Sequence, residues 1–505
     1  MKGEEPPPGA GKPLGRALQT SANILGTGSA FACHHTPDAM YDAFLKQRRA
    51  RGDKGMLEVE SLSRVASRSS VVDSPVAQAA LEEPRTDKFA DVAFAKRIFE
   101  ACGFNAHSVA LPNADLFRLM PREEYIEHRR CCLLRLAELA AERALLSWGG
   151  ARASITHLYW GTMTGAMDSP TLDIHLTRRL GLDPNIDRMS IEGMGCLTGF
   201  RLLNIARQVA AANPSARILV VTADLRSALG SMMPLRPLLR EEMISVALFC
   251  DSGSACVVGG AATGTEAARY ALLGGISRIL DDSEHLVRYQ EHSDTTISLR
   301  LSRELPIEIG KAEYALCIDT LHCAGVPPSV GLDSIDVLCH TGGPRVLNEV
   351  AKSIGVSAEQ MNASWTVMRG HGNLSGSSNL AVLDEHNHMP TSREWAIGLS
   401  CGPGVAIESS LLKRLVPTPA PRHLSMHARP PWWDEEKVQR LRMGLVGEQH
   451  LRLGPRDVVI SSCVLSSPCL PPPPVCSFHS PHTSSCTKRV VGPTASIRDT
   501  GRCAA

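Results

Sequence analysis

The chain has 505 residues, of which 43% are hydrophobic and 21% charged, and its formal net charge at pH 7 is +1. This balance argues against a dedicated nucleic-acid-binding protein, and no stretch reaches the roughly 18 consecutive apolar residues of a membrane span. The 16 cysteines are scattered without a CxxC pair, which favours reduced thiols over a disulfide framework. We therefore expect a cytoplasmic protein.

The two ends of the chain differ from its middle. Residues 1–20 are rich in Pro, Gly and charge and have no apolar signal segment, so we expect a disordered leader. Residues 417–505 are rich in Pro, Ser and Thr, which predicts a largely disordered tail. Cys469 and Cys476 flank four prolines there without the paired spacing of a metal site. About 400 residues are left to fold.

Between these ends the pattern alternates between strand and helix. Residues 22–28 predict a short first strand that runs into a glycine turn, and residues 123–148 have leucines and alanines at the spacing of a long helix. A helix is expected to begin at Cys196 and to end near Pro214, and residues 216–223 then predict a buried strand.

A weak internal repeat predicts two similar α/β halves. Residues 154–162 and 334–342 both follow a loop, begin Ser-Ile, read as a strand and end in a glycine-containing turn. A helix at 344–354 follows the second copy. Each half is expected to close with an antiparallel pair of strands, 245–251 with 255–260 and 393–400 with 405–412. We place the two halves at 21–265 and 266–416.

Three short segments carry the residues best suited to chemistry. They are Gly-Met-Gly-Cys-Leu-Thr-Gly around Cys196, Cys-His-Thr-Gly-Gly-Pro around His340, and His-Gly-Asn-Leu-Ser-Gly around Asn373. Singly, they suit a buried thiol, a packed histidine and a helix-capping asparagine. Together they offer a nucleophile near a helix N-terminus and two neutral donors for a developing oxyanion. That combination favours thioester chemistry.

On these motifs, residues from about 23 to 415 resemble the type III polyketide synthases, the chalcone synthase-like branch of the thiolase superfamily, and most of all its fungal members. Further matches are Ala-Leu-Phe-Cys-Asp ending at Asp251, Leu-Asp-Glu ending at Glu385, and Gly-Pro-Gly ending at Gly404. The resemblance implies a thiolase-like five-layer αβαβα fold of two pseudo-symmetric halves. It also implies a homodimer with a coenzyme A tunnel in each subunit.

The resemblance further implies an acyltransferase mechanism. Cys196, kept ionised by His340, would take the acyl group of an acyl-CoA starter, while His340 and Asn373 would stabilise the enolate formed as malonyl-CoA loses carbon dioxide. Repeated Claisen condensation and cyclisation would give pyrones or resorcinols. Coenzyme A thioesters are the substrates, and no metal or other cofactor is required.

Four positions are expected to shape the pocket. By resemblance Phe249 is an aromatic gate between tunnel and cavity, although a core phenylalanine in a strand is an equal interpretation. Leu299 stands where a second aromatic gate is expected, and Leu229 where plant enzymes have a cavity-lining threonine. Ser375 is expected to line the cavity beside Asn373. The leucine at 299 favours a long acyl starter.

Three other segments received weaker interpretations. Arg64 and Arg68 are candidates for the coenzyme A phosphates, with a solvated face as the alternative. Residues 89–127 have no plant counterpart and either cover a long acyl tunnel or form a surface insertion. The run from Asp384 to His388 is expected to be a solvated charged surface after a helix, not a metal site.

Three competing functions stay open. A ketoacyl synthase of the fatty acid initiation type uses the same three residues for a single condensation. A thiolase would need a second active cysteine, which the Cys401-Gly-Pro-Gly segment only partly imitates. From another class, the unusual tail suggests an inactive scaffold with a thiolase fold.

Overall fold

The computed structural model describes residues 22–50, 89–111, 115–165, 169–227, 230, 232–234, 236–292 and 296–416. The leader 1–20, the tail 417–505, Arg64, Arg68 and Leu229 lie outside these residues, so the expectations for them stay predictions. Among the described helices, none is long and apolar enough to cross a membrane.

The described strands are β1 Ala22–Phe31, β2 Cys33–His35, β3 His107–Val109, β4 His157–Thr162, β5 Asp187–Glu192, β6 Arg217–Leu225, β7 Asp251–Gly259, β8 Tyr270–Gly274, β9 Ser277–Ile279, β10 Val287–Glu291, β11 Ile297–Leu301, β12 Ile335–Cys339, β13 Trp395–Gly402 and β14 Ala406–Arg414. The α-helices are α1 Pro37–Ala50, α4 Val92–Ala101, α5 Arg122–Trp148, α6 Leu172–Arg179, α7 Thr198–Ala212, α8 Arg240–Leu248, α9 Leu305–Cys323, α10 Pro344–Ile354, α11 Asn362–His371 and α12 Ser378–His388.

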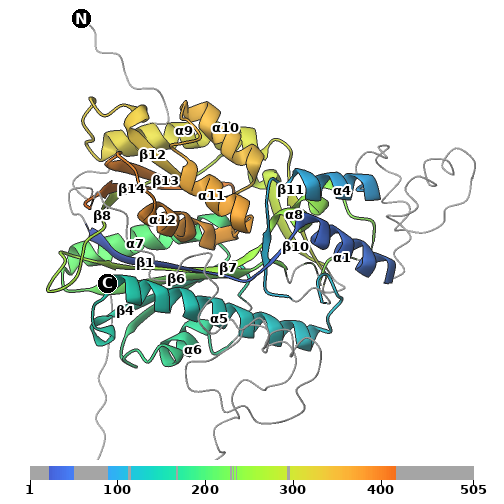
Figure 1. Cartoon of the computed structure of the whole chain (residues 1–505), viewed down its shortest axis with the longest axis horizontal. Coiled ribbons are helices and arrows are strands. Elements are labelled where there is room, and N and C mark those ends of the chain that lie inside the picture. Colours follow the sequence, from blue (N-terminus) through green and yellow to red (C-terminus); the bar gives the residue numbers. More distant parts are fainter. Residues whose placement is uncertain are drawn as a thin grey trace, which may run out of the picture. The chain divides into compact units, whose positions relative to one another are not determined.

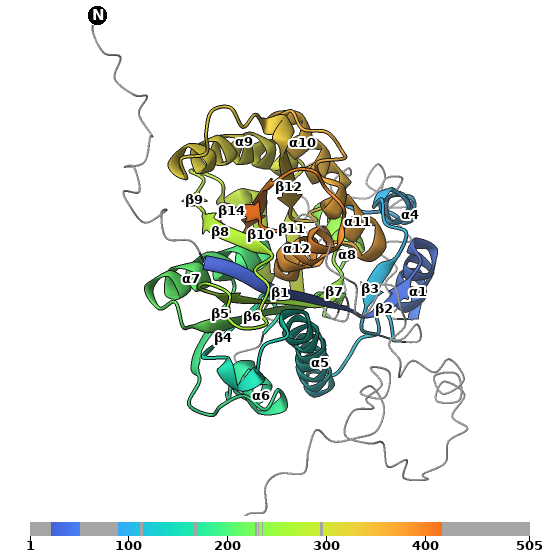
Figure 2. The same cartoon turned by 60° about the vertical axis from the view of Figure 1, so that its left-hand side comes forward.

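Helices and sheet alternate in layers (Figure 1). The main sheet runs in the order β12-β13-β14-β8-β1-β7-β6-β4-β5, and β9 also pairs with β14. Helix α5 covers β1, β6 and β7 on one side, while α7 and α12 contact strands of both halves of the sheet. Helix α9 packs on β13 and β14 from the far side and carries α10, an order that the turned view of Figure 2 also shows. The predicted five-layer αβαβα fold is confirmed.

Close packing of α5 on the sheet depends on two glycines of β1. A Cβ atom at Gly28 would lie 2.4 Å from the backbone nitrogen of Ala144, and one at Gly26 would lie 2.5 Å from the carbonyl oxygen of the same residue. Acidic residues in the first turn of α5 suit the helix dipole, and Gly149 ends this helix at a φ of 72°. The predicted helix at 123–148 is confirmed to within one residue.

The internal repeat is confirmed in the strands that begin it. Strands β4 and β12 each follow a single 3-10 turn, Arg152–Ser154 and Leu332–Ser334, and each pairs in parallel, β4 with β5 and β6, β12 with β13. The antiparallel pair predicted at 393–400 and 405–412 is also present, as β13 and β14.

The pair predicted at 245–251 and 255–260 is wrong. Residues up to Leu248 belong to α8, and β7 begins only at Asp251 and pairs with β1 and β6. A run of Val, Ala, Leu and Phe suits either a helix or a strand. The helix is favoured because its N-terminus is capped: the Glu242 carboxylate accepts a hydrogen bond from the backbone N–H of Leu239 at 2.9 Å.

The segment from Asp384 to His388 was also wrongly interpreted as a solvated surface. It lies within α12, the central helical layer, and the residues from Asp384 to Asn387 are at most 4% exposed. His386 Nε2 lies 3.0 Å from the Asp336 carboxylate, and its Nδ1 lies 2.9 Å from the Tyr270 hydroxyl. The charges therefore belong to a buried polar network. No group of three or more metal-binding side chains occurs in the part of the chain that the structure describes.

Candidate active site

Cys196 lies in the turn that leads into α7. The 3-10 turn Gly195–Leu197 precedes the helix, and the Asn379 side-chain amide donates to the carbonyl oxygen of Cys196 at 3.0 Å. Gly195 has a φ of +64°, and a Cβ atom there would lie 2.5 Å from Pro403 Cδ, so only glycine fits. This packing holds the Cys196 sulfur near the N-terminus of α7, where the helix dipole favours negative charge.

Asn373 is held by its own backbone and by the turn that follows. Its N–H donates to Leu248 O and its carbonyl accepts from the Cys250 N–H, at 3.2 and 2.8 Å. Its side-chain oxygen accepts the N–H of Ser375 at 3.0 Å, which leaves the amide N–H groups as donors for a ligand. Ser375 takes a φ of +55°, a left-handed conformation that a side chain rarely adopts.

His340 follows β12 and is oriented by Ser378. The His340 Nδ1 atom lies 2.5 Å from the Ser378 hydroxyl oxygen, and that hydroxyl lies 2.8 Å from the carbonyl oxygen of Ser375. Since a carbonyl can only accept, both bonds are satisfied when the hydroxyl donates to Ser375 and accepts from the Nδ1–H. The neutral ring then presents an unprotonated Nε2 as a base.

One cavity brings the three motifs together. Cys196, His340 and Asn373 line it, as do three of the predicted pocket residues, Phe249, Leu299 and Ser375. Much of the remaining wall is apolar, with Met163, Val287, Leu301, Leu305, Ile309, Val346 and Val405. A nucleophile, a base and an amide donor thus share one largely apolar chamber.

Burial favours the neutral forms of Cys196 and His340. It raises the pKa of the Cys196 thiol to about 11, although the positive charge of Arg226 lowers it, and it lowers the pKa of His340 to about 3. The resemblance implied a Cys196 that His340 keeps ionised, and that expectation stays a prediction.

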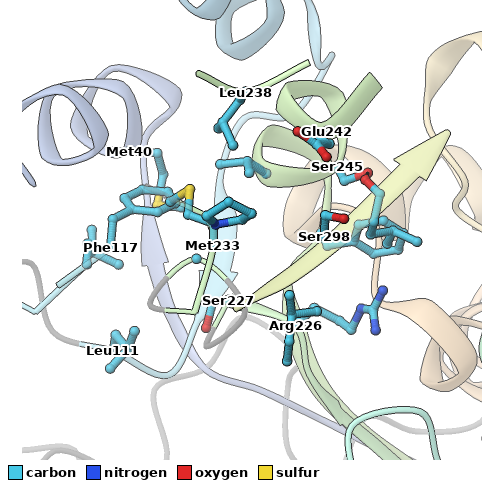
Figure 3. A pocket seen from close by; sticks show the side chains of 17 residues that line it. Met40, Leu111, Phe117, Arg226, Ser227, Met233, Leu238, Glu242, Ser245 and Ser298 are labelled. Carbon is cyan, nitrogen blue, oxygen red and sulfur yellow. Dashed lines mark hydrogen bonds between the residues drawn. The ribbon is translucent and has the colours of Figure 1, made fainter. Parts of the chain in front are cut away.

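A second cavity shares part of its wall with the first. Figure 3 shows the side chains that line this second cavity. Phe249, Leu299 and Arg226 line both cavities, so the predicted gate lies between them. Part of the wall of the second cavity comes from the segment 89–127, with Leu111, Leu116 and Phe117, and from α1, with Met40. Residues of the segment 89–127 therefore line a cavity, while its interpretation as the cover of a long acyl tunnel stays a prediction.

Sequence reasoning missed Asp224 and Arg226, at and just after the end of β6. The Asp224 carboxylate accepts hydrogen bonds from the backbone N–H groups of Met163 and Gly376, at 2.6 and 2.9 Å, and so joins two loops of the site. Polar residues at the end of a buried strand were the signal that found His340, and the same reasoning applied to residues 217–223 would have found these two.

Beneath the site, Glu313 of α9 is buried without an ionic partner among the described residues. Its Oε2 atom lies 3.8 Å from the sulfur of Cys339, the residue before His340. Burial raises the pKa of the Glu313 carboxyl to about 8. Because this exceeds the unfolded value of about 4.3, the contribution to stability is full below about pH 4 and is lost as the pH rises to 8.

We therefore expect Glu313→Gln to raise Tm by several degrees at pH 8.5 and by little at pH 5, in thermal unfolding at both values. The control is Glu308→Gln on the same helix, where the side chain is 45% exposed. An increase of equal size at both pH values would exclude titration of Glu313 as the cause.

Two family descriptions match the chain. Residues 118–262 match "Chalcone and stilbene synthases, N-terminal domain", and residues 274–416 match the C-terminal domain of the same family. The chain belongs to the chalcone and stilbene synthase family, the type III polyketide synthases. The resemblance inferred from the three motifs is confirmed, and polyketide synthases of this family are acyltransferases.

Individual relatives agree with this assignment. The chain is 29% identical over 359 residues to "Probable polyketide synthase 1" of Dictyostelium discoideum, an alignment that covers 69% of this chain and 11% of the length of that protein. Its fold is similar to the C-terminal type III polyketide synthase domain of Steely1, a type I/III hybrid from Dictyostelium (TM-score 0.65, 24% identity, 78% of this chain, 100% of that one). It is also similar to ORAS, a fungal type III polyketide synthase (TM-score 0.62, 22% identity, 78% and 99%).

Proposed function

We propose that the chain catalyses iterative polyketide synthesis, with an acyl-CoA starter loaded on Cys196, malonyl-CoA as extender, and cyclisation to pyrone or resorcinol products. The observation that carries the proposal is the single cavity lined by Cys196, His340 and Asn373. These substrates are coenzyme A thioesters, and the reaction needs no metal or redox cofactor. We expect it to take place in the cytoplasm.

Loading begins when the Cys196 sulfur attacks the carbonyl carbon of the starter thioester. The thiol proton passes to His340 Nε2, while Ser378 fixes the ring through Nδ1. Coenzyme A leaves as its thiol when the tetrahedral intermediate collapses and takes that proton. His340 returns to its neutral form, and the acyl group stays on the sulfur.

Extension uses Asn373 and His340 as hydrogen-bond donors. His340 Nε2 takes a proton from solvent, and malonyl-CoA loses carbon dioxide. The electron pair of the broken bond becomes an enolate whose oxygen accepts hydrogen bonds from the Asn373 amide and from His340 Nε2–H. The enolate carbon then attacks the acyl thioester on Cys196, and the released thiolate takes the proton of His340. A largely apolar chamber strengthens these hydrogen bonds because little water competes for them.

The adjoining cavity suits a long apolar starter. Leu299 belongs to the wall that both cavities share, and the far wall carries Leu111 and Phe117. We expect Leu299→Phe to fill the passage and to shorten the preferred starter by several carbons, with little change for acetyl-CoA. The measurement is kcat/KM over a series of saturated acyl-CoA starters. Leu301→Phe, a change in the first cavity only, is the control, and an unchanged chain-length preference in Leu299→Phe would remove position 299 from the acyl path.

The edge of the sheet supports the proposed homodimer. Strand β5 is the last strand of the path, pairs within the described residues only with β4, and has mostly exposed or half-exposed side chains. An unpaired edge of this kind is available to a second copy. Sedimentation equilibrium of the purified protein distinguishes a dimer from a monomer.

Product analysis tests the proposed function. Purified protein is incubated with malonyl-CoA and a series of acyl-CoA starters, and products are identified by mass spectrometry. Pyrones or resorcinols that contain two or more malonyl units are expected. Products of a single condensation, or activity only with an acyl carrier protein, would instead indicate a ketoacyl synthase, and no turnover by folded protein would indicate an inactive scaffold.

A further inference from the structure

Arg226 is a buried cation that forms no salt bridge with a described residue. It is 4% exposed, and its Nε and Nη1 atoms make no hydrogen bond. A guanidinium keeps its charge inside a protein, and its burial is costly unless an acceptor or an anion pairs with it. A ligand that carries an acceptor or a negative charge can supply the partner that this arginine lacks.

Asp224, two residues earlier, does not fill this need. Burial raises the pKa of the Asp224 carboxyl and the positive charge of Arg226 opposes that rise, but the two side chains form no salt bridge. The Asp224 carboxylate instead accepts hydrogen bonds from Thr162, Met163 and Gly376. The Arg226 guanidinium carbon instead lies 4.6 Å from the centre of the Phe249 ring. A ring face attracts the charge and fixes the position of the guanidinium, but it cannot accept N–H bonds as a carboxylate does.

The position of Arg226 indicates which part of a substrate can contact it. It lines both cavities, so it stands where the chamber of Cys196 meets the adjoining apolar space. Figure 3 shows Arg226 at the opposite end of that space from Met40 and Phe117. A hydrocarbon chain at this point offers no acceptor to the N–H groups of the Arg226 guanidinium.

We propose that Arg226 is a substrate-recognition residue that binds an anionic oxygen carried by the substrate. The inference rests on the proposed function, in which two groups bring such an oxygen into the cavity. One is the carboxylate of the malonyl unit before decarboxylation. The other is an enolate oxygen of the β-keto chain on Cys196, formed when a carbon between two carbonyls loses a proton to solvent. Both offer the acceptors that a guanidinium fork prefers.

Kinetics of Arg226→Met and Arg226→Gln distinguish the two sources. If Arg226 binds the malonyl carboxylate, KM for malonyl-CoA rises about tenfold or more while KM for the starter is unchanged. If it binds the β-keto chain, KM for malonyl-CoA stays the same and the products contain fewer malonyl units. Arg226→Lys keeps the charge without the fork, and we expect it to restore part of the loss.

The matched control is Arg240→Met. Arg240 also lies over a phenylalanine ring, Phe94 at 5.0 Å, and its Nε atom is unpaired, but it lines neither cavity. The proposal is overturned if Arg226→Met and Arg226→Gln differ from Arg240→Met neither in KM for malonyl-CoA nor in product length. It is also overturned if the two KM values rise together, since that indicates a structural role.

Binding of small probes separates this inference from the proposed function. Malonate and pentane-2,4-dione carry the two candidate groups and need no turnover. By calorimetry, we expect at least one of them to bind wild type and Arg240→Met about tenfold more tightly than Arg226→Met, whether or not the enzyme makes polyketides. Equal binding to all three proteins, or no binding to wild type, would overturn the role of Arg226.

Discussion

Replacing Cys196 by alanine is expected to abolish condensation, a loss of about a thousandfold or more, and to leave decarboxylation of malonyl-CoA in place. In the proposed mechanism the sulfur forms the bond that holds the acyl chain, and alanine offers no group that can form it. His340 and Asn373 still face a bound malonyl thioester in this variant. Mass spectrometry of the intact protein after incubation with acyl-CoA, together with carbon dioxide release from malonyl-CoA, measures the two steps separately.

Cys401→Ala is the matched control because Cys401 lines the same cavity. Cys401 lies in strand β13 and not at a helix N-terminus as Cys196 does, and burial raises the pKa of its thiol well above its ordinary value. We therefore expect an unreactive thiol and nearly unchanged condensation. Condensation by Cys196→Ala would disprove the nucleophile. An equal loss in Cys401→Ala would favour the two-cysteine chemistry of a thiolase.

Replacing Asn373 by alanine is expected to slow decarboxylation and condensation by about a hundredfold to a thousandfold, while the starter still loads on Cys196. The amide N–H groups of Asn373 are directed by the bond between its side-chain oxygen and the Ser375 N–H. Alanine removes the donors where negative charge develops on the malonyl oxygen. Single-turnover measurements of acyl-enzyme formation and of carbon dioxide release distinguish the two effects.

Asn362→Ala, at the exposed start of α11, serves as the control for removal of an asparagine close to the site in sequence. We expect wild-type rates for this variant. If Asn373→Ala also failed to load the starter, Asn373 would have a structural role in the chamber rather than a role in enolate formation.

The sequence predicted those residues of the site whose positions depend on a short local segment. Cys196, His340 and Asn373 each lie in a glycine-containing turn beside a regular element, and the motifs around them occur in the order that the resemblance implied. The chamber that joins them is consistent with this prediction. Local sequence is sufficient here because each turn places its own side chain.

What the sequence could not supply depends on contacts between distant segments. The orientation of His340 comes from Ser378, and the wall of the second cavity comes from residues such as Leu111 and Phe117. The helical state of residues 245–248 and the burial of His386 follow from packing that an apolar or charged run does not reveal. The burial that favours the neutral forms of Cys196 and His340 likewise reflects the whole chamber and not their neighbours in sequence.

The pairing of Phe249 with Asn373 has a consequence for how this enzyme can diversify. The two residues form a backbone bridge, and their neighbours Leu248 and Cys250 hydrogen-bond to the main chain of Asn373. We therefore expect a change of shape at 249 to disturb Asn373, whose amide stabilises the enolate in the proposed mechanism. Leu299 of β11 also lines both cavities. Its carbonyl accepts a hydrogen bond from the Ser245 hydroxyl and not from Asn373. We therefore expect new starter preferences to arise at 299 at little cost to the chemistry, and variation at 249 to change preference and rate together.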